Sequence, residues 1–182
     1  MTRNKTRVEG KSSNPLELSR QILRSFEEHK QAWKDKLHSP IRIAIWKPPP
    51  NGWVKLNFDA AVREEKPSLA TVGRDDKGDF IFAWAGQVEP GSPLVGVAKV
   101  ALCAIKRAIE NGFSKIIVEG DAWNVKDPLC NIGMKPHCSI AKVIADILDF
   151  VKCFDVVSFS YMYRDGNVPS YLLAHGRLLL IV

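Results

Sequence analysis

The sequence predicts an α/β domain with a five-stranded mixed sheet flanked by helices, and two observations indicate that class. Residues 54–88 contain three short runs with strand periodicity, separated by turn residues, which is typical of an antiparallel meander. From residue 93 onwards, helical patterns alternate with two more apolar strand runs, which is typical of parallel strands joined by helices. One sheet is therefore expected to contain both kinds of strand pairing.

The residues before this pattern predict three further segments. Residues 1–13 are polar and charged and are expected to form a flexible basic tail. Residues 14–37 predict an amphipathic helix, which opens with a cap residue, a proline and, three residues after the cap, an acid. Residues 38–53 contain three consecutive prolines and predict an extended linker to the domain at 54–182.

Within the domain, the first strand has the clearest pattern. Val54, Leu56 and Phe58 alternate with polar residues, which predicts a half-buried strand with Asp59 on the face opposite the apolar residues. The other elements follow in order: strands at 69–73, 80–88, 114–119 and 156–163, and helices at 93–111, from about 123, from 137 to about 151 and at 167–180.

Composition excludes several classes of protein. The chain of 182 residues is 46% hydrophobic and 25% charged, which is normal for one globular domain. No apolar run approaches the roughly 20 residues of a membrane-spanning helix, so no membrane partner is expected. The N-terminus lacks the apolar core of a secretory signal, so an intracellular protein is expected. The four cysteines are scattered and have no zinc-site spacing.

The net charge of +6 is concentrated near the N-terminus. Residues 1–40 hold 9 Lys and Arg against 5 Asp and Glu, and the remainder holds 17 against 15. A basic arm of this kind could bind phosphate backbones through counterion release, or could be a solvated tail. Charge alone favours neither interpretation.

Two acids stand where an α/β sheet would place a metal or ligand site. Asp59 lies on the polar side of the first strand, and Asp121 follows the buried fourth strand. Ligands of open α/β sheets bind beyond such strand ends. The pattern by itself nevertheless favours ordinary alternatives, namely a surface acid at Asp59 and a helix cap at Asp121.

Four segments resemble plant ribonuclease H-like domains, which are related to the RNase H part of non-LTR retroelement reverse transcriptases. The segments are Trp46-Lys-Pro-Pro-Pro-Asn-Gly-Trp53-Val-Lys-Leu-Asn-Phe-Asp59, Gly73-Arg-Asp-Asp-Lys-Gly78, Gly112-Phe-Ser-Lys-Ile-Ile-Val-Glu-Gly-Asp121, and Tyr163-Arg-Asp-Gly-Asn167 with Leu172-Leu173-Ala174. The resemblance implies an RNase H-like fold and a nuclease that cuts the RNA strand of an RNA–DNA hybrid. It also implies four carboxylates that hold two Mg²⁺ ions about 4 Å apart.

The resemblance supplies only two of those four acids. Asp59 and Asp121 match the acids of the first and fourth strands, and they are the residues implied for catalysis and metal binding. Val97 and Tyr171 occupy the other two positions. Val97 also extends the apolar stripe of its predicted helix, so a core role suits it, and Tyr171 is a poor metal ligand.

Three hypotheses about function therefore remain. The chain could be an active Mg²⁺-dependent nuclease with a reduced site, or a nucleic-acid-binding domain with impaired catalysis. It could also be a decayed protein-interaction domain with no nucleic-acid role. The two replaced acids and the basic arm favour the second hypothesis, and the near-balanced charge of residues 41–182 favours the third.

Overall fold

The computed structural model describes residues 45–61, 67–131 and 133–176. The predicted tail at 1–13, the predicted helix at 14–37 and the first part of the predicted linker lie outside these residues. The described elements are β1 (Val54–Ala61), β2 (Ser68–Arg74), β3 (Phe80–Gln87), α2 (Pro93–Glu110), β4 (Lys115–Gly120), α3 (Trp123–Cys130), the 3-10 helix η1 (Cys138–Ile140), α4 (Ala141–Val151), β5 (Val156–Tyr161), the 3-10 helix η2 (Arg164–Gly166) and α5 (Val168–Ala174). No helix in these parts of the chain is long and apolar enough to cross a membrane.

The five strands form one mixed sheet, as predicted, and their order is β3-β2-β1-β4-β5. β2 is antiparallel to both β1 and β3, while β4 is parallel to both β1 and β5. The short turn between β2 and β3 makes an antiparallel hairpin, whereas the parallel strands are joined by helices. β1 therefore occupies the centre of the sheet.

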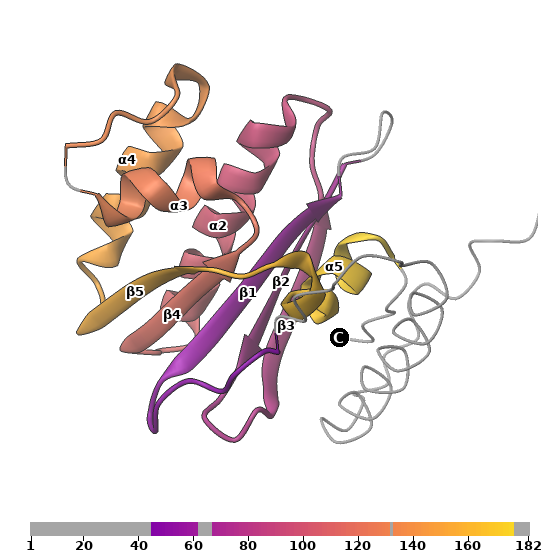
Figure 1. The fold of residues 1–182 in the computed structure, drawn as a ribbon, viewed down its shortest axis with the longest axis vertical. Coiled ribbons are helices and arrows are strands. Elements are labelled where there is room, and N and C mark those ends of the chain that lie inside the picture. Colours follow the sequence, from indigo (N-terminus) through magenta and orange to yellow (C-terminus); the bar gives the residue numbers. More distant parts are fainter. Residues whose placement is uncertain (1–44, 62–66, 132, 177–182) are drawn as a thin grey trace, which may run out of the picture.

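Helices cover both faces of the sheet, again as predicted (Figure 1). α2 packs against β1, β2 and β4 and also contacts α3 and α4, whereas α5 packs against β1 and β2 on the opposite face. The larger core lies under α2 and contains Leu56, Phe58, Ile105 and Ile116 among its buried side chains. A smaller core under α5 includes Leu172 and Val72.

The prediction of a half-buried first strand is wrong, because β1 is buried on both faces. Its apolar residues face the larger core, but the polar residues Lys55, Asn57 and Asp59 are each at most 7% exposed. Their face of the sheet is covered by α5 and by Trp46, which donates a hydrogen bond from Nε1 to Asn57 Oδ1 at 3.1 Å. Trp46 thus attaches the chain before β1 to the sheet.

Asn57 is the centre of a buried polar network on this face. Its Oδ1 also accepts from Arg74 Nη2 at 2.7 Å, and its Nδ2 donates to Glu119 Oε2 at 3.2 Å. The Arg74 guanidinium lies 3.5 Å from the ring centroid of Trp46. Burial lowers the pKa of Arg74 to about 9, so the guanidinium remains charged at neutral pH.

Glu119 balances part of the positive charge in this network. Its Oε1 lies 3.0 Å from Lys55 Nζ and accepts from Ser160 Oγ at 2.8 Å. Lys55 Nζ donates in turn to the carbonyl of Lys47 at 2.8 Å. Buried charges are tolerated where they are paired and hydrogen-bonded, which is the case for Lys55 and Glu119.

Two helix boundaries differ from the predictions. The first turn of the helix predicted from 137 is the 3-10 helix η1, and the α-helix begins at Ala141. The helix predicted to reach 180 ends at Ala174. Gly176 adopts a left-handed φ of 63° and donates from its N–H to Leu173 O at 3.1 Å, which is how glycine ends a helix.

The short helix α5 is fixed to β1 through Asn167. Its Nδ2 donates to the carbonyl of Phe58 at 2.8 Å, just beyond Asn57, where the parallel pairing of β1 with β4 ends. The Asn167 side chain also accepts from Ser170 Oγ at 2.5 Å. Asn167 is 1% exposed, so water cannot replace these bonds.

Replacing Asn167 by alanine is expected to lower the free energy of unfolding by about 1–3 kcal/mol, because the buried Phe58 carbonyl loses its donor. The matched control is Asn111→Ala, which removes a 2.8 Å bond from an exposed Nδ2 to the Arg107 carbonyl. Water can replace that donor, so the control should cost less. Chemical denaturation of both variants measures the difference, and equal losses would contradict this account of α5.

Candidate nucleic-acid site

The strand register brings Asp59 and Asp121 together. In the parallel ladder Asn57 pairs with Glu119, so moving two residues along each strand reaches Asp59 and Asp121 on the same face. Gly120 lets the Phe58 ring pack against the end of β4, because a Cβ at that position would lie 2.3 Å from Cζ of the ring. The two strand ends place the acids near enough for the charge of Asp121 to act on Asp59.

Asp59 is buried, and its environment opposes its charge. Burial is the largest cause that raises the pKa of Asp59 to about 6, and repulsion from Asp121 adds to it. The N–H of Ala60 donates to Asp59 Oδ1 at 2.9 Å and, like the positive charge of Arg164, partly offsets this effect. The alternative of an ordinary surface acid at Asp59 is wrong, because only 7% of the residue is exposed.

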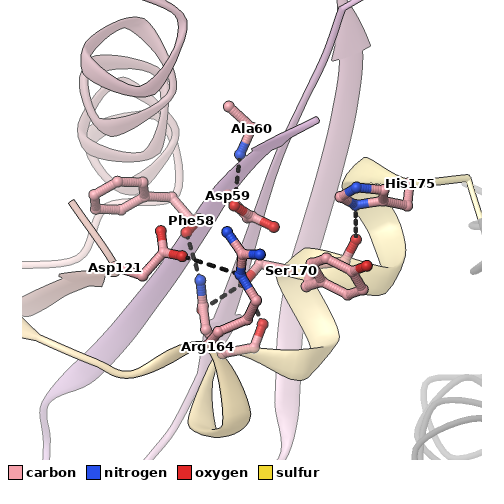
Figure 2. Close-up of polar contacts among 9 residues, drawn as sticks. Phe58, Asp59, Ala60, Asp121, Arg164, Ser170 and His175 are labelled. Atoms are coloured by element: carbon pink, nitrogen blue, oxygen red, sulfur yellow. Dashed lines mark hydrogen bonds and ion pairs between the residues drawn. The ribbon is translucent and has the colours of Figure 1, made fainter. Parts of the chain in front are cut away.

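Asp121 contacts a cation instead of capping the next helix. The N-cap of α3 is Ala122, and no side chain caps that helix terminus. The Asp121 carboxylate instead accepts from Arg164, with Oδ2 3.4 Å from Nε. Figure 2 shows the Arg164 guanidinium directed toward the two acids, and its charge acts on Asp59 as well. We call these three side chains, Asp59, Asp121 and Arg164, the acid–arginine cluster.

Arg164 comes from η2, and the start of α5 fixes its backbone. The Asn167 N–H donates to the Arg164 carbonyl at 3.0 Å. The Arg164 side chain is 63% exposed, with Cζ 5.8 Å from the ring centroid of Tyr171. Sequence reasoning did not identify this residue, although it lies inside the quoted Tyr163–Asn167 segment. Nothing local marked it, because its partner Asp121 lies 43 residues earlier in the chain.

Val97 and Tyr171, which the resemblance aligns with the other two acids, lie in different surroundings. Val97 is partly buried on α2 and packs against the larger core, which agrees with its predicted core role. Tyr171 lies on α5 beside the smaller core, and its ring centroid is 4.1 Å from that of His175. The Tyr171 carbonyl also lies 2.9 Å from His175 Nδ1 (Figure 2).

The chemical groups of the acid–arginine cluster limit which ligands it can bind. Carboxylates are suitable ligands for Mg²⁺, and the cluster has two of them. Within residues 45–61, 67–131 and 133–176, no group of three or more His, Cys, Asp or Glu residues could hold a metal ion. The Arg164 guanidinium, in contrast, is an exposed donor suited to phosphate oxygens.

The raised pKa of Asp59 predicts a dependence of stability on pH. The Asp59 carboxyl has a pKa of 3.8 in the unfolded chain and about 6 in the folded one, so folding takes up a proton at pH values between the two. The free energy of unfolding should therefore fall by on the order of 2–3 kcal/mol as pH rises through this window. Asp59→Asn removes the charge and keeps an acceptor for Ala60, so it should flatten the fall and stabilise the protein at neutral pH. Denaturation across this pH range measures both effects, and an unchanged profile would refute the assignment.

Comparisons with known proteins agree with this fold. The model of the reverse transcriptase-like family matches residues 57–176. No significant match was found among curated proteins. The RNase H1 of Halobacterium salinarum is similar in structure, with a TM-score of 0.64 and 19% identity over 69% of this chain and 97% of that one.

Two further solved structures show the same likeness. The N-terminal RNase H domain of a Mycobacterium tuberculosis protein has a TM-score of 0.63 and 13% identity, over 69% of this chain and 93% of that one. LC11-RNase H1, solved in complex with an RNA/DNA hybrid, has a TM-score of 0.58 and 12% identity, over 66% of this chain and 91% of that one. Identities this low establish the fold alone. The family match covers most of the described domain and both acids, and the chain therefore belongs to the reverse transcriptase-like family, with an RNase H-like fold.

Proposed function

We propose that this protein is a nucleic-acid-binding domain that recognises RNA–DNA hybrids or related duplexes, and that its hybrid nuclease activity is severely impaired. The observation that carries the proposal is the acid–arginine cluster. There an exposed guanidinium, whose Nε lies 3.4 Å from Asp121 Oδ2, supplies positive charge to an acid pair that in the nuclease lineage would serve metal ions.

The cluster has too few carboxylate ligands for a pair of Mg²⁺ ions. Two-metal chemistry needs carboxylates that bridge both ions, and the family positions at Val97 and Tyr171 carry none. Arg164 also competes with any cation for the Asp121 carboxylate. Asp59, with a pKa of about 6, is a weaker ligand than an ordinary aspartate near that pH, because part of its population is protonated.

Three features support binding to nucleic acid. LC11-RNase H1, which has the same fold, was solved with an RNA/DNA hybrid. The chain has a net charge of +6, which favours a polyanion. Arg164 presents most of its side chain to solvent beside the strand ends, where it can donate to a phosphate while its Nε stays with Asp121.

The second candidate is a decayed protein-interaction domain without a nucleic-acid role. The near balance of 17 basic against 15 acidic residues in 41–182 favours it, because most nucleic-acid-binding domains carry a larger excess of positive charge. The two candidates differ in how binding to a hybrid should respond to salt.

Hybrid binding by the full chain is expected to weaken steeply as salt rises, because binding releases counterions from the phosphates. Arg164→Gln should weaken binding and reduce the salt slope by about one. Arg107→Gln is the matched control, since Arg107 is also exposed and ion-paired but lies on α2. Fluorescence anisotropy with a labelled hybrid measures these slopes. If the wild-type protein does not bind at low salt, the interaction-domain candidate replaces this one.

Cleavage of the same hybrid tests the catalytic part of the proposal. With Mg²⁺ or Mn²⁺ present, the wild-type chain is expected to cut the RNA strand slowly or not at all. The double variant Val97→Glu with Tyr171→Asp restores the missing carboxylates and is expected to raise cleavage. Adding Asp59→Asn to that variant should abolish the gain. Wild-type cutting that is lost in Asp59→Asn would instead mean that two acids suffice.

A further inference from the structure

We infer that the acid–arginine cluster is flanked by a stacking platform for an unpaired nucleotide, formed by Trp123, Tyr161 and Tyr163. The inference rests on the proposed nucleic-acid role and extends it. It predicts a preference for a duplex that continues into a single strand over a blunt duplex.

The three rings form one continuous aromatic group. The Trp123 and Tyr161 rings are stacked, with centroids 4.1 Å apart and planes 12° from parallel. Tyr163 meets Tyr161 edge to face, with centroids 5.1 Å apart. Trp123 is 47% exposed and Tyr163 is 51% exposed, although large aromatic side chains usually bury more of their surface.

The fold places these rings beside the cluster through both the sheet and the chain. Tyr161 pairs with Gly120, the residue before Asp121, in the ladder between β5 and β4. Trp123 follows Asp121 by two residues, and Tyr163 directly precedes Arg164. A nucleic acid whose phosphates contact Arg164 therefore has aromatic faces within reach of its neighbouring bases.

Charge at the platform suits a nucleotide in particular. The Lys126 ammonium lies 4.7 Å from the ring centroid of Trp123, and its ion pair with Asp127 is loose, at 3.6 Å. Arg164, the residue after Tyr163, provides a second cation. A base stacked on the indole brings a phosphate with it, and the Lys126 ammonium beside the ring can pair with that phosphate.

An unpaired nucleotide fits better than a base pair within a duplex. Inside a duplex both faces of each base are covered by neighbouring bases, so an aromatic ring can stack only on an unpaired or terminal base. Proteins that bind single strands combine such rings with cations along the backbone. The ordinary alternative is that the Trp123–Tyr161 stack only fastens α3 to β5, and the variants below separate the two roles.

The test uses the full chain and three labelled probes: a blunt RNA–DNA hybrid, the same hybrid with a single-stranded extension, and the single strand alone. The extension is expected to strengthen wild-type binding by roughly five- to hundredfold, as expected for stacking of one base. Trp123→Leu should lose that gain and change blunt-hybrid affinity far less, because a blunt hybrid offers the ring only its terminal base pairs. Trp123→Phe, which keeps a ring, should retain much of it.

Three further variants control for misfolding and for unspecific effects of charge. Tyr163→Leu removes an exposed ring that fastens no helix to the sheet, and it should reduce the extension gain even if Trp123→Leu fails to fold. Lys126→Ala should reduce the gain, whereas Lys142→Ala should not, although Lys142 is also in a 3.6 Å ion pair with an aspartate.

The outcomes distinguish this inference from the proposed function. If wild type gains nothing from the extension, or if Trp123→Leu and Tyr163→Leu keep the whole gain, the platform is refuted while blunt-hybrid binding still supports the proposed function. If wild type binds the single strand through Trp123 and does not bind the blunt hybrid, the platform stands and hybrid recognition fails. Binding to none of the probes refutes both.

Discussion

The hydrogen bond from Asn167 to the Phe58 carbonyl is the contact on which the site depends. It joins the last described helix to the central strand at the residue before Asp59, in a place that water does not reach. The same asparagine accepts the N–H of Tyr171 on its backbone carbonyl and donates its own N–H to Arg164. The buried side-chain amide thus joins the segment that carries Arg164 and Tyr171 to the strand that carries Asp59.

Local periodicity predicts the strands of this fold well and the burial of β1 poorly. Alternation in residues 54–61 identified the strand and the direction of Asp59, because the side-chain period of a strand is a local property. Whether the polar face is covered depends on distant partners, here Trp46 and α5. Alternating polar residues are usually solvated, so Asn57 and its buried neighbours could not be recognised from the strand alone.

The candidate site also contains residues that the sequence predicts and residues that it does not. Asp59 and Asp121 could be singled out because each stands at a strand end and because the family motif includes both. Arg164 could not, since its partner Asp121 is 43 residues away and many arginines precede helices without contacting an acid. The platform was missed for a related reason: Trp123 and Tyr161 are distant in sequence, and only the β4–β5 pairing brings them together.

The ion pair between Arg164 and Asp121 also bears on the repulsion between the two acids. Clustered acids that await metal ions repel one another, so a nuclease active site weakens its own fold while it is empty. In this chain the Arg164 guanidinium offsets part of that repulsion, because its charge acts on Asp59 as well as on Asp121. The acid pair is therefore partly neutralised by a residue of the protein itself, whether or not a cation is bound.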